Sequence, residues 1–349
     1  MSFEDDYLAA RKALELETDK FVESLKPLVP RLTALESGYE LIDASIFHIL
    51  RPAKQETRNQ LARSAFRNLL LNRNVDHVPA YAGKLCDYLN LVDPDAVLDR
   101  ALRGESFLFA GFHTGPYWSI FQSFVKIGVD VTTLLPESLA SKREEISDVF
   151  AAATKHTGSK STLELIRLDD PNFLIRVRSS NAAGRQLVVF LDGYSGAPTK
   201  RNERRDVELD FFHSRITVKT TILRLADILG LPLVTFNAVR EEISRTLYLD
   251  PPMQKGNNEQ YDEVARIVYD RLLRRLQQEP AQWEGWLYFH NYFSPGFRSS
   301  LGLQVQPTIW PTLEKASRFV IQAQGNQNII FDKQTYRHYQ VNKLQGAQI

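Results

Sequence analysis

The feature that most constrains this chain is an alternation of short apolar runs with longer amphipathic segments, which begins near residue 106. The short runs are typical of buried strands, and they lie at 107–112, 130–135, 163–168, 187–192 and 231–236. Helical patterns separate or follow them at 115–127, 141–156, 171–182, 216–230 and 259–278. Strands that are joined through helices pair in parallel, and a parallel sheet is covered on both faces. The pattern therefore predicts an α/β fold with a mostly parallel central sheet flanked by helices.

The segment before this alternation is helical in pattern. Apolar residues recur at helical spacing from Tyr7 to Leu25, and two further helical runs cover about 55–72 and 78–90. We expect residues 1–97 to form a helical N-terminal region that precedes an α/β domain at 98–302.

The sequence pattern changes again after residue 302. The segment FVIQAQGNQNIIFD at 319–332 predicts a β-hairpin that turns at Gly325-Asn326, and 337–341 predicts one more strand. We expect residues 303–349 to form a small β-containing appendage.

Composition excludes several classes of protein. The 349 residues include 43 basic and 42 acidic ones, so no overall field attracts nucleic acid. A single cysteine, Cys86, excludes an internal disulfide and any zinc site with two thiolates, and it suits a reducing compartment. The N-terminal segment is acidic and helical in composition, unlike a signal peptide, and the sequence contains no uninterrupted apolar run of about 18 residues. We expect a cytoplasmic protein, and the sequence also allows a peripheral contact with the inner membrane.

Motifs for common cofactors are missing from the sequence. No Gly-x-Gly-x-x-Gly follows a strand, and no phosphate loop or His-Glu-x-x-His occurs. DGYSGA at 192–197 has the wrong spacing for a nucleophile elbow. We therefore expect no bound cofactor or metal and no serine-hydrolase site.

Two polar residues stand where predicted strands end. His113 follows FLFAGF, and Asp192 closes LVVFLD. The carboxyl ends of parallel strands meet at one edge of a sheet, where ligands bind. A neutral imidazole at that edge can take a proton from a hydroxyl or an amine, and a carboxylate can hold its tautomer. The alternatives are a strand-end histidine bonded to backbone and an aspartate that only forms a turn with Gly193.

A charged segment at 200–219 allows two interpretations. Its basic residues are Lys200, Arg201, Arg204, Arg205, Arg215 and Lys219. They can bind a phosphate or an acidic carrier protein, whereas the acids between them favour a solvated loop. His48 lies in an apolar helical context and is expected to be structural. Trp283, Trp286 and Phe289 are expected in the core.

Four segments in this order resemble the bacterial lipid A late acyltransferases, within the broader lysophospholipid acyltransferase-like group. The segments are GESFLFAGFHTGPYW, LVVFLDG with VELDFFHS after it, ILRLADILGLPLVTFNAVR, and EPAQWEGWLYFHNYF. The resemblance covers about 98–293. It implies transfer of a fatty acyl group from acyl carrier protein or acyl-CoA to a hydroxyl or an amine, with His113 as general base.

The resemblance also implies roles for other residues. The family carries an acid five positions after the histidine, and here that position is Trp118. Asp192 matches the aspartate of the family's second block and is expected to support His113, and Trp118 is expected to contact substrate. The alternative is that His113 works alone on an easier acceptor, such as an amine. Lys155 falls near the family's basic residue before the second block. Arg240 matches the arginine that ends the third block and is expected to bind a phosphate or carboxylate.

The acyl-transfer hypothesis also predicts where the oxyanion is bound and what kind of acceptor is used. We expect backbone amides near Thr114 and Gly115 to donate hydrogen bonds to the oxyanion. The family usually has a membrane-anchoring N-terminal helix, and charged helices replace it here, which favours a soluble or carrier-borne acceptor.

Two other functions compete with acyl transfer. Because Trp118 replaces the acid, the chain could be a catalytically degenerate relative that binds a protein or an acyl chain. A hydrolase with water as acceptor is the third reading. The sequence leaves the acceptor, the acyl chain length, the donor type and the oligomeric state open.

Overall fold

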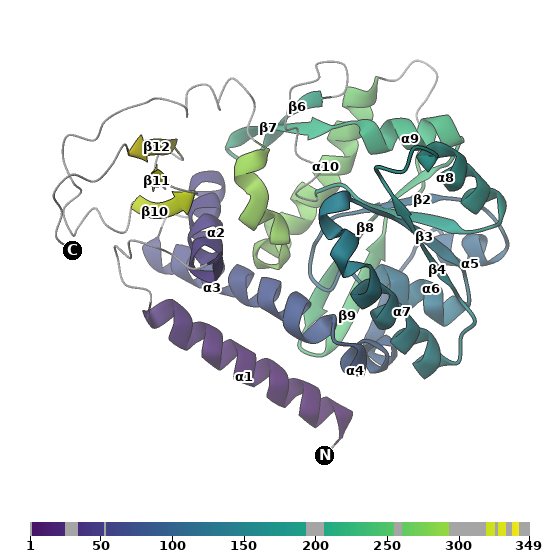
Figure 1. The fold of residues 1–349 in the computed structure, drawn as a ribbon, viewed down its shortest axis with the longest axis horizontal. Coiled ribbons are helices and arrows are strands. Elements are labelled where there is room, and N and C mark those ends of the chain that lie inside the picture. The colour runs from purple at the N-terminus through teal and green to yellow at the C-terminus, as the bar shows by residue number, and fades with distance from the viewer. Residues whose placement is uncertain are drawn as a thin grey trace.

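The fold is built around a seven-stranded sheet with helices on both faces (Figure 1). In this computed structural model, the described residues are 2–24, 34–51, 54–192, 206–254, 260–292, 319–324, 327–332 and 337–341. The strands of the sheet are β1 (Leu89–Val92), β2 (Leu108–Gly111), β3 (Val131–Leu135), β4 (Leu163–Arg167), β5 (Gln186–Phe190), β8 (Leu233–Glu241) and β9 (Ser244–Leu249). The predicted α/β class is confirmed.

The strand order places β2 at the centre of the sheet. The order is β1-β9-β8-β2-β5-β3-β4, and all neighbours are parallel except β8 and β9. Leu108 pairs with Leu187 of β5 on one side and with Leu233 of β8 on the other. The carboxyl ends of β2, β5 and β8 therefore lie at the same edge, which we call the carboxyl edge.

The two faces of the sheet bury separate apolar cores. Along β2, Leu108 and Ala110 belong to one core and Phe109 belongs to the other, as the two-residue period of a strand requires. The Phe109 core is covered by α5 (Val97–Leu102), α6 (Ser119–Ile127) and α7 (Arg143–Thr157). The opposite core is covered by α8 (Phe173–Ala182), α9 (Thr221–Leu229) and α10 (Tyr261–Gln278). Helices α6 to α10 confirm the helical patterns expected between and after the strands.

The N-terminal region is helical as expected, but it is joined to the sheet. Its helices are α1 (Phe3–Ser24), α2 (Ala34–Leu50) and α3 (Gln55–Leu71), and α1 runs along the outside of α3 (Figure 1). Side chains of α2 and α3 share a core with β2 and β5. Strand β1 also comes from this region and pairs with β9.

The predicted helix at 78–90 is wrong in its second half. The chain forms α4 (Pro79–Ala82), a 3₁₀ turn at Lys84–Tyr88, and then β1. Gly83 divides them and packs tightly against α7, because a Cβ there would lie 2.7 Å from the carbonyl oxygen of Ala152.

Two hairpins were missed in the sequence. Strands β6 (Asp206–Phe211) and β7 (Ser214–Lys219) form an antiparallel pair, so the helix expected at 216–230 begins at Thr221. The β-branched residues Ile216, Thr217 and Val218 favour the strand. Strand β8 also continues beyond the predicted end at 236, and turns into β9 through Glu242, whose φ is 53°.

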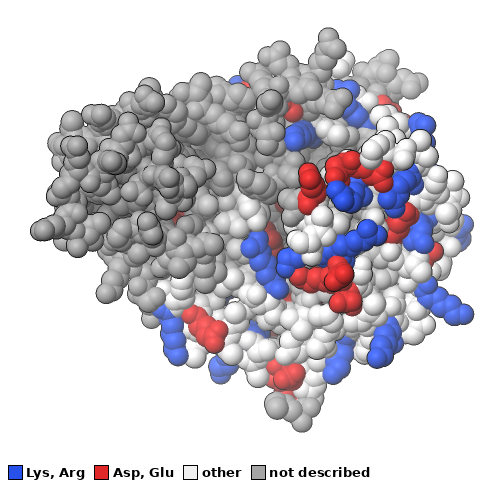
Figure 2. Space-filling view, viewed as in Figure 1, with Lys and Arg blue, Asp and Glu red and all other residues white. Residues whose placement is uncertain are grey.

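The charged segment at 200–219 is described in part. Lys200, Arg201, Arg204 and Arg205 lie outside the described residues. Arg215, on the exposed turn side of β7, pairs with Asp210 at 3.2 Å. Acidic and basic side chains are interspersed over the described part of the face in Figure 2.

The C-terminal segment contains a separate antiparallel sheet, as expected. Its strands are β10 (Phe319–Gln324), β11 (Gln327–Asp332) and β12 (Arg337–Val341). The expected turn at Gly325-Asn326 lies outside the described residues. Among the helices that the structure describes, none combines the length and apolar character needed to cross a membrane.

Candidate active site

His113 stands at the carboxyl edge, two residues after the end of β2. The strand can reach this position because Gly111 has no side chain. A Cβ at Gly111 would lie 2.1 Å from the ring of Phe236 on β8, so any larger residue would have to displace that ring.

The structure brings His113 and Asp192 together. Asp192 follows β5, the strand next to β2, and its Oδ1 lies 2.7 Å from Nδ1 of His113. A carboxylate accepts, so Nδ1 carries the hydrogen and Nε2 carries the lone pair of the neutral ring. This is the tautomer that a general base requires.

Asp192 is itself held by several donors. Its side chain is fully buried, and the backbone N–H of His113 donates to Oδ1 at 3.1 Å and to Oδ2 at 2.9 Å. The indole Nε1 of Trp283 donates to Oδ2 at 2.6 Å. Trp283 is buried in the core as expected, but its polar edge also fixes the carboxylate, a role that sequence reasoning missed.

The imidazole of His113 is packed on its faces and open at its far nitrogen. The ring stacks on Phe190 at 4.4 Å between centroids and meets Tyr117 edge-on at 4.7 Å. Its side chain keeps 23% exposure, and Nε2 has no hydrogen-bond partner among the described residues. Burial lowers the pKa of His113, but the charge and hydrogen bond of Asp192 outweigh it and raise the pKa above the ordinary 6.5. The ring can therefore accept a proton and hold it.

Trp118 lies outside the dyad. It is buried and packs against His77 at 5.1 Å and Phe121 at 4.7 Å between ring centroids. The position that holds an acid in the resembling family therefore supports an aromatic cluster here, and Asp192 occupies the Nδ1 side of His113.

Thr114 and Gly115 connect the site to the rest of the fold. The N–H of Thr114 donates to the carbonyl of Phe112 at 2.7 Å, and that of Gly115 donates to the carbonyl of Gln282 at 2.6 Å. Gly115 has a φ of +49°, and a Cβ there would lie 2.5 Å from the carbonyl oxygen of Ala238. Both amides are engaged in the fold, so the expected oxyanion role does not fit them.

Arg240 lies at the carboxyl edge but inside a sealed ion-pair network. Its guanidinium pairs with Asp76 and also donates to the side-chain oxygens of Asn68 and Asn72. Arg245 completes the network at 2.7 Å from Asp76. The side chains of Asp76, Arg240 and Arg245 are at most 2% exposed, so Arg240 is committed to internal partners rather than to an incoming phosphate.

Lys155 is not brought to His113. It lies near the end of α7, which runs back from β3 to the start of β4, and is therefore at the amino edge of the sheet. Its neighbour His156 bonds to Asp87 at 2.9 Å. His48 is half-buried on α2, and burial lowers its pKa to about 4, in keeping with a structural role.

The N-terminal region contributes residues to the site that sequence reasoning missed. A π-helical turn at Asn72–Asp76 follows α3, and such turns are frequent at functional sites. The amide of Asn72 donates to the carbonyl of Gly115 at 2.8 Å and to Oε1 of Glu284 at 2.7 Å. Arg73 donates to the hydroxyl of Tyr288 at 2.9 Å. The run NRNVDH, which is mostly polar and directly follows the three leucines that end α3, was the available signal.

Glu284 is a further residue of the site that sequence reasoning missed. It is 6% exposed, and its backbone N–H donates to the carbonyl of His113 at 2.9 Å. An acid between Trp283 and Trp286, two residues expected in the core, was the signal that could have found it. Among the described residues no cluster of three or more His, Cys, Asp or Glu side chains is arranged to hold a metal ion.

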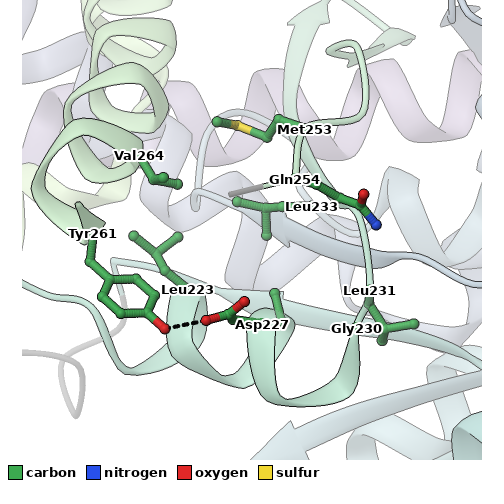
Figure 3. Close-up of a pocket in the computed structure, with 10 residues that line it drawn as sticks. Leu223, Asp227, Gly230, Leu231, Leu233, Met253, Gln254, Tyr261 and Val264 are labelled. Carbon is green, nitrogen blue, oxygen red and sulfur yellow. Dashed lines mark hydrogen bonds between the residues drawn. The ribbon is translucent and has the colours of Figure 1, made fainter. Parts of the chain in front are cut away.

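A pocket in another part of the fold is lined by few polar side chains. It has a volume of about 220 Å³ and lies between α9, α10 and the start of β8, lined mainly by apolar side chains such as Leu223 and Leu233 (Figure 3). Tyr261 bonds to Asp227 at its side. Leu233 pairs with Leu108, five residues before His113, so the pocket is roughly 16 Å from the dyad along the strands.

No protein-family model matches this chain, and no curated protein matches it.

Proposed function

We propose that this protein is an acyltransferase of the lysophospholipid acyltransferase-like type, which moves a fatty acyl group from a thioester donor to a hydroxyl or an amine. Acyl carrier protein or acyl-CoA would be the donor. The observation that carries the proposal is the 2.7 Å contact between His113 and Asp192 at the carboxyl edge, with Nε2 left open. Cys86 as a lone buried thiol fits a cytoplasmic location, which is part of the proposal.

In the proposed reaction, Nε2 of His113 removes a proton from the acceptor as the acceptor attacks the thioester carbonyl. The new C–O or C–N bond forms, the C–S bond breaks, and the imidazolium returns the proton to the departing thiolate. Asp192 stabilises the imidazolium while it exists, and Trp283 keeps the carboxylate in place.

Tyr117 is the candidate donor to the oxyanion. Its ring meets that of His113 edge-on, and burial raises the pKa of its hydroxyl well above 10. The hydroxyl therefore stays protonated and can donate a hydrogen bond to the negative oxygen.

The test is transfer of a radiolabelled acyl group from decanoyl-CoA and from decanoyl-loaded carrier protein to a panel of alcohols and amines. We expect turnover in the wild type, and His113→Gln to lower it by about a thousandfold while circular dichroism shows that the variant remains folded. Wild-type turnover in His113→Gln would overturn the mechanism.

The alternative function, a catalytically degenerate relative that binds a protein or an acyl chain, is supported by Trp118 in place of the family's acid. It predicts no transfer from either donor and a stable complex with a protein or an acyl chain. The hydrolase reading predicts release of free acid in the absence of any acceptor, which the same labelled donors detect.

A further inference from the structure

Two acids act on the charge of His113, and the dyad uses one of them. Asp192 binds Nδ1, whereas Glu284 comes from a different segment and is joined to His113 through its backbone N–H. The Glu284 side chain is buried, yet its charge acts on both His113 and Asp192. A second buried carboxyl beside a base requires an explanation, because burying a charge is costly unless it is paired.

One oxygen of Glu284 is fixed by the fold. Oε1 accepts from Asn72, whose other amide hydrogen goes to the carbonyl of Gly115 and whose oxygen accepts from Arg240. All groups of the Asn72 amide are used, so its orientation is determined. The other oxygen of Glu284, Oε2, has no hydrogen-bond partner among the described residues.

The charge of Glu284 is incompletely compensated. Burial raises the pKa of Glu284, while the charges of His113 and Arg73 and the bond from Asn72 only partly oppose that rise. No ion pair within 4 Å involves Glu284 among the described residues. A cation placed next to Oε2 would favour the ionised carboxyl and gain from a charge that is already desolvated.

We propose that the acceptor is a primary amine, which Glu284 binds as its ammonium form beside Nε2 of His113. This inference rests on the proposed acyl transfer and names its substrate class. An alcohol has one hydrogen, which it must give to the base, and its oxygen would then face the Glu284 carboxylate unpaired. An ammonium has hydrogens for both groups, so a base nitrogen and a free carboxylate oxygen together favour the amine.

The reaction balances for this substrate. The bound ammonium gives one proton to Nε2, and the neutral amine attacks the thioester carbonyl. The C–N bond forms and the C–S bond breaks. The nitrogen releases its second proton to solvent, and the thiolate takes the proton held by His113, so the products are an amide, a thiol and one proton.

The experiment compares matched acceptors in the whole protein. Hexylamine and hexanol are offered with labelled decanoyl-CoA or decanoyl-loaded carrier protein, and each rate is divided by the uncatalysed rate. We expect kcat/KM for the amine to exceed that for the alcohol by at least about tenfold. Glu284→Gln lowers the amine value by about ten- to a hundredfold, because a charged hydrogen bond is lost, and leaves the alcohol value within about threefold.

The control is Glu105→Gln, the same change at the opposite end of β2, where Glu105 is exposed and pairs with Arg100. It leaves both rates unchanged. Equal normalised rates for the two acceptors in the wild type overturn the proposal without any variant, as does a Glu284→Gln protein whose preference for the amine is as large as that of the wild type.

A binding measurement separates failure of this inference from failure of acyl transfer. Calorimetry with hexylammonium chloride detects binding without chemistry. If no acceptor is acylated but hexylammonium binds the wild type and not Glu284→Gln, the transferase proposal fails and the amine site stands. If acyl transfer occurs and hexylammonium binds both proteins equally, the amine site is overturned.

Discussion

Two buried charged clusters lie at the carboxyl edge of the same sheet, and they differ in one respect. The His113 cluster consists of His113, Asp192, Trp283 and Glu284. The Asp76 cluster consists of Asp76, Arg240, Arg245 and Tyr7, whose hydroxyl donates to Asp76 at 3.1 Å. In the His113 cluster the base nitrogen and one carboxylate oxygen lack partners among the described residues, whereas the Asp76 carboxylate is paired with two arginines.

The comparison teaches that residue type alone does not mark a site. Arg240 was expected to bind substrate because it matches a family position, yet its guanidinium holds the N-terminal helices against β8. Burial raises the pKa of Asp76, but the charges of Arg240 and Arg245 outweigh it and the pKa is lowered. Asp76 therefore stays ionised and structural, whereas His113 keeps a partly exposed ring with one unpaired nitrogen.

The largest expected effect is on activity in the His113 cluster. Asp192→Asn should lower kcat for acyl transfer by about 10³- to 10⁴-fold, because the amide cannot stabilise the imidazolium or hold the same tautomer. Activity of the wild type should rise with pH through the raised pKa of His113, since the neutral ring is the base. Without Asp192 that pKa falls, so the rising limb of the pH–rate profile should move to lower pH. An unmoved limb would contradict the dyad.

The next effect concerns stability and comes from the Asp76 cluster. Asp76→Asn leaves two buried arginines without a counter-charge, and should lower the free energy of unfolding by about 3–5 kcal/mol. Urea denaturation measures it, and Asp210→Asn on the exposed β6–β7 hairpin is the matched control, with an expected loss under about 1 kcal/mol. If Asp76→Asn is as stable as the wild type, the cluster is not the structural element we describe.

Trp118→Glu restores the acid of the resembling family and sharpens the comparison. The new carboxyl would be buried against His77 and Phe121, so we expect a loss of stability of about 2–4 kcal/mol. Activity should not increase, because Nδ1 of His113 is already bonded to Asp192. Thermal unfolding and the acyl-transfer assay check both statements; a gain in turnover would indicate a decayed site.

The smallest expected effect is on the pH dependence of stability, to which His77 and His113 contribute with opposite signs because their pKa values shift in opposite directions. Burial lowers the pKa of His77 to about 3, so its contribution to stability is present above the ordinary value of 6.5 and is lost as pH falls. The raised pKa of His113 acts oppositely: its contribution is present below 6.5 and is lost as pH rises through the folded pKa.

Acid titration of stability tests this difference. His77→Asn should reduce the loss of stability between pH 7 and pH 5.5 by about 1 kcal/mol, and His113→Gln should increase that loss slightly. Urea midpoints at several pH values measure both. Identical pH slopes in the wild type and His77→Asn would rule out a buried neutral His77.

Sequence reasoning was most successful for features that arise locally. The runs at 107–112 and 187–192 indicated strands of a mostly parallel sheet, and the position of His113 and Asp192 after those strands placed both at one edge. Sequence reasoning failed to predict strands that depend on their pairing partners. Strand β1 lies at the edge of the sheet and pairs with a segment over 150 residues away, and β6 and β7 stabilise each other. Short strands of this kind have little local signal, because pairing supplies most of their stabilisation.

The sequence by itself determined the α/β fold, the buried strands, and the placement of a histidine and an aspartate at the ends of two of them, because side-chain periodicity and strand polarity are local properties. Tertiary structure alone decided that Asp192 reaches Nδ1 of His113, that Arg240 is sealed while Nε2 is open, and that Asn72 and Glu284 join the site from segments far apart in the chain. Those outcomes depend on contacts between segments up to 212 residues apart, whose distances and exposure no local pattern encodes.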